Sequence, residues 1–205
     1  MRISRGRTDR ASVAALAGAA ALAASLAGCG GRPPGVEAPQ PGPPPRAYTA
    51  AEVFTVEVWG AQAPDTVVTF LASHAREVVL RHGPPDNTVF AELEFPAGAM
   101  VPPGGRDSVT IAIRPVPGIY GITLSTDATL KTPARLTFKY PVHFAAPADS
   151  RTRYPTDVLF EQALLMAQAE DDGSRFQTLR SSRPASDNLQ AVIATPGRYQ
   201  MVAPR

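Results

Sequence analysis

The chain has 205 residues, of which 20 are basic, 18 are acidic, 22 are proline and one is cysteine. A single cysteine excludes an intramolecular disulfide, and the near balance of charge excludes the strongly basic surface that is typical of nucleic-acid binding. The abundance of proline is hostile to long helices, so the length predicts one domain built of short elements.

Residues 1–28 have the pattern of a secretory signal peptide. A basic start is followed by a run of small and apolar residues from Ala11 to Ala27. The basic residues are Arg2, Arg5, Arg7 and Arg10. The run is too short and too rich in alanine for a membrane span, which needs ~20 strongly apolar residues. Its removal would leave 16 basic and 17 acidic residues, because four arginines and one aspartate are lost.

Leu26-Ala27-Gly28-Cys29 resembles the lipobox of bacterial lipoproteins. The resemblance implies that the Cys29 thiol carries a diacylglycerol unit and that cleavage makes Cys29 the new N-terminus. A plain signal peptide with a chance cysteine is the alternative. Lipidation at Cys29 predicts a protein of the bacterial cell envelope that is anchored to a membrane through its lipid. Gly30 stands where an aspartate would favour the inner membrane, so the outer membrane is expected in a double-membraned cell.

Residues 29–49 are predicted to be the lipidated cysteine and a proline-rich linker. The stretch from Gly30 to Arg46 holds seven prolines and few large apolar residues, which favours extended polyproline II structure. At ~3.1 Å per residue this stretch reaches about 50 Å at most. We expect it to hold the domain away from the bilayer, although a ligand for a proline-recognition domain has the same composition.

Residues 50–205 predict one domain, an all-β antiparallel β-sandwich. Val89, Ala91, Leu93 and Phe95 alternate with polar residues, as do the apolar residues of Ser108–Arg114. Many short strands at regular spacing are typical of a sandwich or barrel. The other predicted strands are Val53–Trp59, Thr66–Leu71, Arg76–Arg81, Ile119–Leu124, Arg135–Val142, Phe176–Leu179, Leu189–Ala194 and Arg198–Val202. Pro141 predicts a sheet edge or a strand end.

Phe95-Pro96-Ala97-Gly98-Ala99, followed by a glycine-rich loop and the strand Ser108–Arg114, resembles the ZU-five type domain. This is a β-sandwich found in tight-junction scaffolds, netrin receptors and ankyrins. The resemblance extends over about Arg76–Val202. Further matching segments are Phe138-Lys139-Tyr140-Pro141-Val142, Leu164-Leu165-Met166, Asp171-Asp172-Gly173, Phe176 with Leu179, and Tyr199-Gln200-Met201-Val202. It implies an Ig-like or ZU-five-like sandwich that acts as an interaction module.

The resemblance also bears on two local questions. Some relatives cleave themselves at a His-Phe-Ser sequence, but His143-Phe144 is followed by Ala145, so self-processing is not expected. The segment Asp157–Asp172 has the composition of a helix, whereas the resemblance implies a strand. We expect Leu159–Ala167 to be a strand, because tertiary pairing often overrides propensity.

Residues that could carry chemistry are few. The histidines His74, His82 and His143 form no zinc motif. His82 and Asp86 could touch a metal, and Asp171-Asp172 with Asp187-Asn188 could bind calcium if the two turns met. Solvated turns are the favoured interpretation of both pairs. No catalytic residue, metal site or cofactor is therefore predicted.

Other candidates are also interpreted structurally. Ser108 and Ser125 lie outside a nucleophile elbow, and Gly104-Gly105 lies outside a phosphate-binding motif. Three aromatic residues are expected in the core rather than in a ligand site: Phe54, Trp59 and Phe70. Three arginines near Ser181-Ser182 are expected to form a charged loop rather than an anion site: Arg175, Arg180 and Arg183.

The sequence thus predicts a non-catalytic, lipid-anchored β-sandwich of the cell envelope that serves as a protein-interaction or structural module. The membrane is one partner, reached through the lipid on Cys29, and an unidentified envelope protein is the other. No nucleic acid is expected. The alternative is an envelope protein that binds a small molecule or metal, or a hydrolase whose site is assembled from loops.

Overall fold

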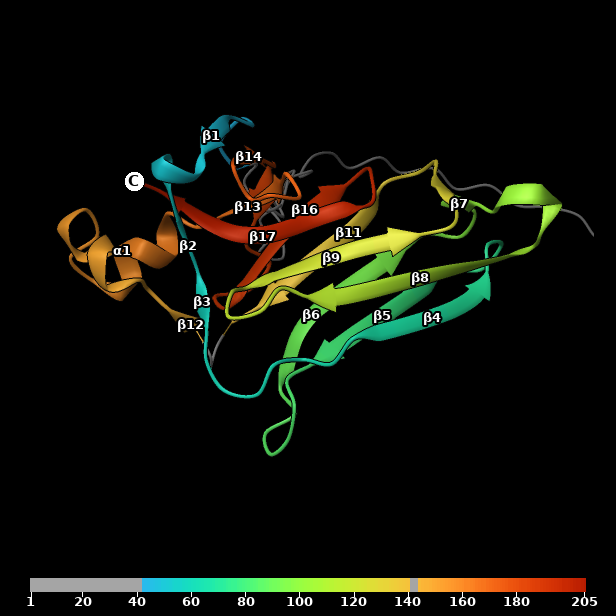
Figure 1. Ribbon diagram of the computed structural model, residues 1–205, viewed down its shortest axis with the longest axis horizontal. Helices are drawn as coiled ribbons and strands as arrows, with labels where there is room; N and C mark the ends of the chain where they lie inside the picture. The colour runs from blue at the N-terminus through green and yellow to red at the C-terminus, as the bar shows by residue number, and fades with distance from the viewer. Residues whose placement is uncertain (1–41, 141–143) are drawn as a thin grey trace, which may run out of the picture. The chain divides into compact units, whose positions relative to one another are not determined.

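The computed structural model describes residues 42–140 and 144–205. These residues form two main antiparallel sheets packed against each other, with short helices around them (Figure 1). The predicted all-β, sandwich-like architecture is therefore confirmed. In this part of the chain, none of the helices is long and apolar enough to cross a membrane.

The larger sheet has eight strands. They are β1 (Ala47–Thr49), β2 (Val53–Thr55), β4 (Thr66–Leu71), β8 (Ser108–Pro115), β9 (Gly121–Thr126), β13 (Leu165–Ala169), β14 (Arg175–Thr178) and β17 (Gly197–Pro204). Their order is β1-β14-β13-β17-β9-β8-β4, and β2 pairs with β17 beside this path. Among the described strands, β1 and β4 therefore form the two opposite edges of this sheet.

The second sheet has five strands in the order β15-β16-β11-β6-β5. They are β5 (Arg76–Arg81), β6 (Val89–Phe95), β11 (Ala134–Lys139), β15 (Ser181–Ser182) and β16 (Asn188–Ile193). Two small ribbons pair β3 (Glu57–Val58) with β12 (Phe144–Ala145) and β7 (Met100–Val101) with β10 (Thr129–Leu130). The helices are η1 (Ala50–Glu52), η2 (Pro103–Gly105), η3 (Ala148–Thr152) and α1 (Asp157–Gln162).

The core lies between the two sheets, where period-two alternation places it. Val109, Ile111 and Ile113 of β8 are fully buried, as the alternation predicts. Leu93 and Phe95 of β6 belong to the same apolar cluster and are buried from the other sheet. Each side chain of this size contributes about 1.5–3 kcal/mol when it is buried. The alternating strands thus hold the fold together without a disulfide.

The predicted turn after β6 is present. Gly98 has a φ of 70°, a value that a residue with a Cβ rarely adopts. The Ala99 N–H donates to the Pro96 carbonyl oxygen at 3.0 Å, which closes the turn. Glycine at position 98 therefore permits the reversal after β6, while membership of the ZU-five family stays a prediction.

The prediction of a strand over Leu159–Ala167 is wrong in its first half. The chain forms α1 up to residue 162 and begins β13 at residue 165. The Thr156 side chain caps the helix, since its Oγ1 accepts from the Leu159 N–H at 3.3 Å. Phe160 points into the core and is fully buried. Local capping and one anchoring aromatic residue therefore keep the helix that composition favoured.

The first predicted strand, Val53–Trp59, is divided into β2 and β3. Val56 lies between them, where its N–H donates to the Met201 carbonyl oxygen and its own carbonyl accepts from Tyr120. The chain thereby leaves the large sheet after β2 and joins the small ribbon with β12. Other strand ends shift by a few residues, so Ile119 precedes β9 and β11 ends before Tyr140. Pro141 lies outside the described residues.

The domain starts earlier than the predicted boundary at residue 50. Residues 47–49 form β1, which pairs with β14, and Tyr48 lies opposite Phe176. Just before it, the Arg46 N–H donates to the Thr178 side chain at 2.8 Å, and the Thr178 N–H donates back to the Arg46 carbonyl oxygen. The end of the predicted 29–49 linker is therefore part of the sheet. The proline-rich composition up to residue 45 predicted a linker and did not indicate this pairing.

The prediction that three aromatic residues lie in the core holds for two of them. Phe54 is 4% exposed, and Phe70 is partly buried against the core. Trp59 is 65% exposed, so the prediction for this residue is wrong. Trp59 follows the two-residue β3, where the chain turns away from the sandwich and no strand carries the side chain back to the core.

Candidate functional site

Two predicted features lie outside the described residues. These are the signal peptide, residues 1–28, and Cys29 with its predicted lipid. His143, one of the three histidines weighed as ligands, is also outside. The described residues can therefore show where the predicted linker enters the domain, but the anchor itself remains a prediction.

The loop that holds His82 and Asp86 has a structural role in the described residues. His82 is 2% exposed, its Nδ1 lies 3.2 Å from the Ala61 carbonyl oxygen, and its ring contacts Phe90 edge-on. Asp86 is exposed and accepts from the Thr88 N–H at 3.2 Å. A solvated turn is thus the correct interpretation for Asp86, but it is wrong for His82, whose imidazole is packed in the core.

The two acidic turns weighed as a calcium site lie at opposite ends of β13. Asp171 and Asp172 follow the end of this strand, and Asp172 accepts from the Ser174 N–H within its own turn. The loop that leads to Asp187 contacts the strand's start, because Arg183 donates to the Leu164 carbonyl oxygen at 2.9 Å. Within the described ranges, no cluster of three or more metal-ligating side chains exists.

Arg183 caps the end of helix α1 and is not part of a solvated charged loop. Its guanidinium donates to three backbone carbonyl oxygens, those of Glu161, Gln162 and Leu164, at 2.7, 3.3 and 2.9 Å. Glu161 and Gln162 lie in the last turn of α1, where carbonyl oxygens lack the full set of helical partners, and Leu164 lies two residues beyond the helix. Arg175 lies on β14, away from this cap, so the three arginines do not form one cluster of equal roles. The expectation of a simple solvated loop is therefore wrong for Arg183.

The remaining residues considered for chemistry lie on strands or turns. Ser108 begins β8, and Ser125 on β9 donates to the Ala112 carbonyl oxygen at 3.4 Å. Gly104 and Gly105 belong to η2, and both have positive φ values. Their positions are explained by backbone geometry.

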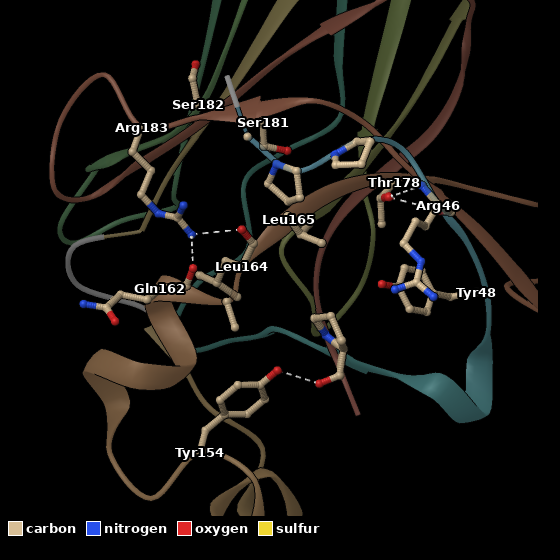
Figure 2. A pocket seen from close by; sticks show the side chains of 15 residues that line it. Arg46, Tyr48, Tyr154, Gln162, Leu164, Leu165, Thr178, Ser181, Ser182 and Arg183 are labelled. Carbon is tan, nitrogen blue, oxygen red and sulfur yellow. Dashed lines mark hydrogen bonds between the residues drawn. The ribbon is translucent and has the colours of Figure 1, made fainter. Parts of the chain in front are cut away.

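A groove runs between the entering N-terminal segment and α1 (Figure 2). Its volume is about 550 Å³. One wall is formed by Gly42–Tyr48, and the other by Tyr154 and the end of α1. The lining residues are Gly42, Pro43, Pro44, Arg46, Tyr48, Tyr154, Gln162, Ala163, Leu164, Leu165, Thr178, Ser181, Ser182, Arg183 and Pro204. The groove was not predicted from the sequence, because one of its walls lies in the predicted linker.

The electrostatic character of the groove is positive. Its charged lining residues, as far as the structure describes them, are Arg46 and Arg183, and no carboxylate lies among them. The Arg46 guanidinium lies 5.5 Å from the centre of the Tyr48 ring, which orients it by a cation–π contact. Hydroxyl groups of Tyr154 and Ser182 add polar character. Such a lining suits a phosphate or carboxylate better than a cation.

The second candidate surface is the edge strand β4. In the part of the chain that is described, β4 pairs only with β8. Val67 and Leu71 are 68% and 41% exposed on its outer face. The strand contains no charged residue and no proline. Natural edge strands usually carry such residues, a bulge or a covering element that blocks pairing with another chain.

The backbone of β4 is oriented for pairing at this edge. Thr110 on β8 turns its backbone towards β9, because its N–H donates to the Asp127 side chain and its carbonyl accepts from the Asp127 N–H. Thr69 lies opposite Thr110 in the β4–β8 register. Antiparallel pairs alternate between bonded and non-bonded positions, so Thr69 turns its N–H and C=O away from β8. Val67 lies two residues before Thr69, so its N–H and C=O groups also point away from β8.

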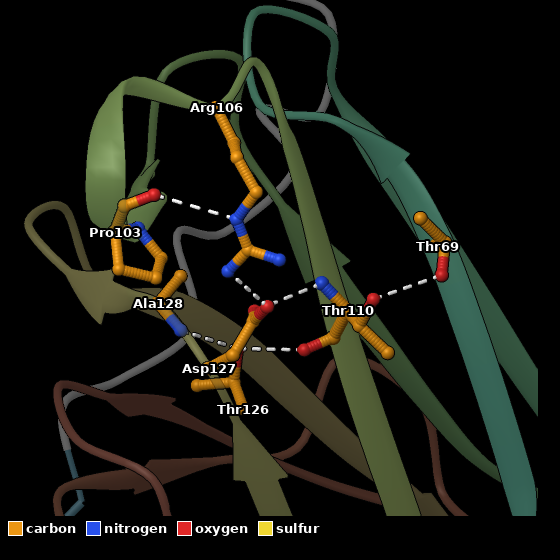
Figure 3. Close-up of polar contacts among 7 residues, drawn as sticks. All are labelled: Thr69, Pro103, Arg106, Thr110, Thr126, Asp127 and Ala128. Atoms are coloured by element: carbon orange, nitrogen blue, oxygen red, sulfur yellow. Dashed lines mark hydrogen bonds and ion pairs between the residues drawn. The ribbon is translucent and has the colours of Figure 1, made fainter.

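A polar network fixes the end of the β8–β9 hairpin beside this edge (Figure 3). Asp127 accepts from the Thr110 N–H at 3.0 Å and from the Arg106 guanidinium at 2.6 Å. The Thr110 and Thr69 hydroxyl oxygens lie 2.9 Å apart and share a hydrogen bond. The Thr110 N–H, followed by Arg106, holds the pKa of the Asp127 carboxyl below its usual value. The network thus joins β4 to the β8–β9 hairpin through side chains. The N–H and C=O groups that β4 turns away from β8 take no part in it.

The other sheet edges in the described part differ from β4. β15 has two residues and β1 has three, so both offer little backbone. β5 is as long as β4 but carries Arg76, Glu77 and Arg81. Length and lack of charge therefore coincide at β4. The sequence predicted this strand with its observed bounds, but it could not predict which strands lie at an edge.

Comparison of the chain with protein families, curated proteins and solved structures finds no match in any of the three.

Proposed function

We propose that this chain is a non-catalytic, lipid-anchored module of the bacterial cell envelope that binds an extended segment of another envelope protein along β4. The anchor is the lipid on Cys29, and the outer membrane is the expected membrane in a double-membraned cell. The open, uncharged edge of β4 is the observation that carries the proposal.

Recognition along this edge would work by strand addition. An added strand would accept hydrogen bonds from the outward N–H groups of Val67 and Thr69 and would donate its own N–H groups to their C=O oxygens. Main-chain bonds of this kind supply affinity, whereas neighbouring side chains supply selectivity. Val67 and Leu71 lie on the outer face and offer apolar contact to alternate side chains of the partner. A partner segment with apolar residues at every second position is the best fit.

The order of the strands separates this surface from the anchor. The predicted tether joins the domain at β1, and β4 is the opposite edge of the same sheet. The path between the two edges crosses six strand-to-strand steps, or about 29 Å at a spacing of ~4.8 Å. Such a separation supports a role in which the domain is held at one edge and binds at the other.

Site-specific photo-crosslinking in cells tests the proposal. A photoreactive residue at Val67 should capture one dominant envelope protein, whereas the same residue at Val192 should not. Val192 is a matched control, because it is 60% exposed but lies on β16, which is paired on both sides. Equal capture at the two positions, or capture at neither, would refute the role of β4.

The anchor is tested separately. Cys29→Ser should leave unprocessed precursor and abolish acylation, as measured by mass spectrometry of the purified protein. A correctly cut, unacylated wild-type chain would contradict the anchor while leaving the binding role of β4 open to its own experiment.

A further inference from the structure

Helix α1 exposes two adjacent apolar side chains. Val158 is 60% exposed and Leu159 is 47% exposed, whereas the next residue, Phe160, is fully buried. Phe160 is thus the residue that attaches the helix to the core. Packing within the domain does not account for the outward position of Val158 and Leu159, so a contact with another apolar phase is a physical explanation.

These side chains continue one wall of the positive groove. Residues four apart on a helix lie on the same face, so Val158 lies beside Gln162 and Leu159 beside Ala163. Gln162 and Ala163 both line the groove (Figure 2). The apolar pair and the groove therefore form one surface, which we call the α1 face: Val158, Leu159, Gln162, Ala163, Arg46 and Arg183.

The predicted lipid tether reaches the domain at this surface. Gly42 packs so closely on Ser181 that a Cβ atom at residue 42 would collide with the Ser181 backbone carbonyl. The chain is thereby held against the groove from Gly42 onwards. From Cys29 to Gly42 there are 13 residues, which span about 45 Å at the very most. The groove that Gln162 and Ala163 of the α1 face line is thus also lined by the point where the lipid-bearing segment joins the domain.

The charges around the α1 face suit contact with lipid headgroups. Arg46 and Arg183 line the groove without a carboxylate beside them among its described lining residues. The acidic residues of α1 have partners of their own. Asp157 forms an ion pair with Arg151 at 2.6 Å, and Glu161 interacts with the Tyr140 hydroxyl. Arg183 interacts with the same hydroxyl and donates to three backbone carbonyl oxygens, whereas Arg46 is exposed. The surface therefore presents apolar side chains next to one open cation, Arg46, a combination found where proteins lie on membranes.

We propose that the α1 face rests on the bilayer to which Cys29 is anchored, with Val158 and Leu159 inserted among the acyl chains and the exposed Arg46 at the phosphate level. This inference depends on the lipid anchor of the proposed function. Full burial of an aliphatic side chain contributes about 1.5–3 kcal/mol, which is weak for a free protein. A tether raises the effective concentration to the millimolar range, so a weak contact is sufficient. The contact directs the β4 edge away from the membrane.

Depth-dependent fluorescence quenching tests the proposal. The acylated mature chain carrying Trp59→Phe, which removes its one tryptophan, is reconstituted in vesicles of phosphatidylcholine and phosphatidylglycerol with brominated acyl chains. Leu159→Trp places a reporter on the α1 face, and Val192→Trp places one on a distant exposed strand. Quenching should be several-fold stronger at position 159 than at position 192. Val158→Trp serves as a second reporter if Leu159→Trp does not fold.

The outcomes separate the two proposals. Equal quenching at positions 159 and 192, in protein that floats with the vesicles, overturns the contact of the α1 face and leaves the anchor intact. Protein that fails to float overturns the anchor, and the inference falls with it. Strong quenching at position 159 that is lost in Val158→Asp confirms insertion of the apolar pair.

Discussion

The two edges of the large sheet, β1 and β4, belong to one layer but have opposite properties. β1 is three residues long, and its neighbours hold it through both backbone and side-chain bonds. β4 is six residues long, is uncharged and turns outward backbone groups for which the described residues offer no backbone partner. The same sheet thus supports an edge that receives the predicted tether and an edge that is open to a partner.

The two edges differ in whether their outward backbone groups have hydrogen-bond partners. At β1, the Thr49 N–H and hydroxyl donate to the Glu52 carboxylate at 2.8 and 2.9 Å, so a side chain closes the strand's end. At β4, Asp127 closes the neighbouring hairpin and leaves the outer side of Thr69 free of described backbone partners. A carboxylate thus accepts from an outward N–H at β1, whereas no described carboxylate accepts from the Thr69 N–H at β4.

The largest expected effect separates the two sides of β4. Val68 lies opposite Ile111 at a position bonded to β8, so Val68→Pro should remove a ladder bond and cost about 3 kcal/mol or more. Thr69→Pro removes only an outward N–H and should cost about 1 kcal/mol, chiefly through its lost hydroxyl bond. Urea denaturation of the two variants measures the difference.

The same pair gives a functional readout. With a photoreactive residue at Leu71, Thr69→Pro should abolish partner capture although the domain stays folded. Equal destabilisation by the two prolines would show that the backbone of Thr69 faces β8, and the open edge would then be wrong.

The β1 edge should respond to the loss of one hydroxyl group. Thr178 is 2% exposed, and its Oγ1 accepts from the Arg46 N–H and donates to the Arg46 carbonyl oxygen. Thr178→Val keeps the shape but removes both bonds, so it should lower the free energy of unfolding by about 1–2 kcal/mol. Faster amide exchange in Tyr48, with β4 unchanged, would localise the effect to this edge. An unchanged exchange rate at Tyr48 would contradict it.

The strands that the sequence predicted correctly are those that bury one face. In β6 and β8, polar residues alternate with buried ones such as Leu93 and Ile111, and this pattern has no helical counterpart. Where burial depends on distant segments, the pattern is absent. β1 follows a run of prolines, and its pairing with β14 joins residues more than a hundred positions apart. β1 is a strand because of this tertiary pairing, which local composition could not predict.

The candidate surfaces were less visible than the strands. The sequence marked Thr66–Leu71 as a strand, but only the strand order makes it an edge. The groove is lined by Arg46 from the predicted linker and by Arg183 from a predicted charged loop, two segments that are far apart in the sequence. Trp59 shows the converse, since its residue type predicted burial while its short strand leaves it exposed. Edges and grooves arise from topology, which a single sequence does not display.

Acid should loosen both edges through their carboxylates. Hydrogen bonds from Thr49 hold the pKa of Glu52 below its usual value, and those from the Thr110 N–H and Arg106 do the same for Asp127. A lowered pKa in the folded state gives stability that is complete above the unfolded pKa of about 4 and is lost as the pH falls through the folded value. The protection of the Thr49 and Thr110 amides, measured as the exchange rate relative to the intrinsic rate at each pH, should therefore fall below about pH 4.

Amide variants provide the control for this pH dependence. Glu52→Gln should remove the acid response at Thr49 alone, and Asp127→Asn should remove it at Thr110 alone. A response at both amides in either variant would mean that acid acts on the whole domain rather than on each edge.

The smallest expected effect on stability is the most selective for function. Val67 is 68% exposed, so Val67→Lys should change the free energy of unfolding by no more than about 0.5 kcal/mol. A lysine on an edge strand nevertheless blocks strand addition, because pairing would bury its charge beside the incoming chain. Capture of a partner from a photoreactive residue at Leu71 should therefore be lost. Val192→Lys adds the same charge at a position of similar exposure on β16, and it should leave that capture unchanged. Loss of capture in both variants would assign the effect to net charge, and retention in both would show that the partner does not pair with β4.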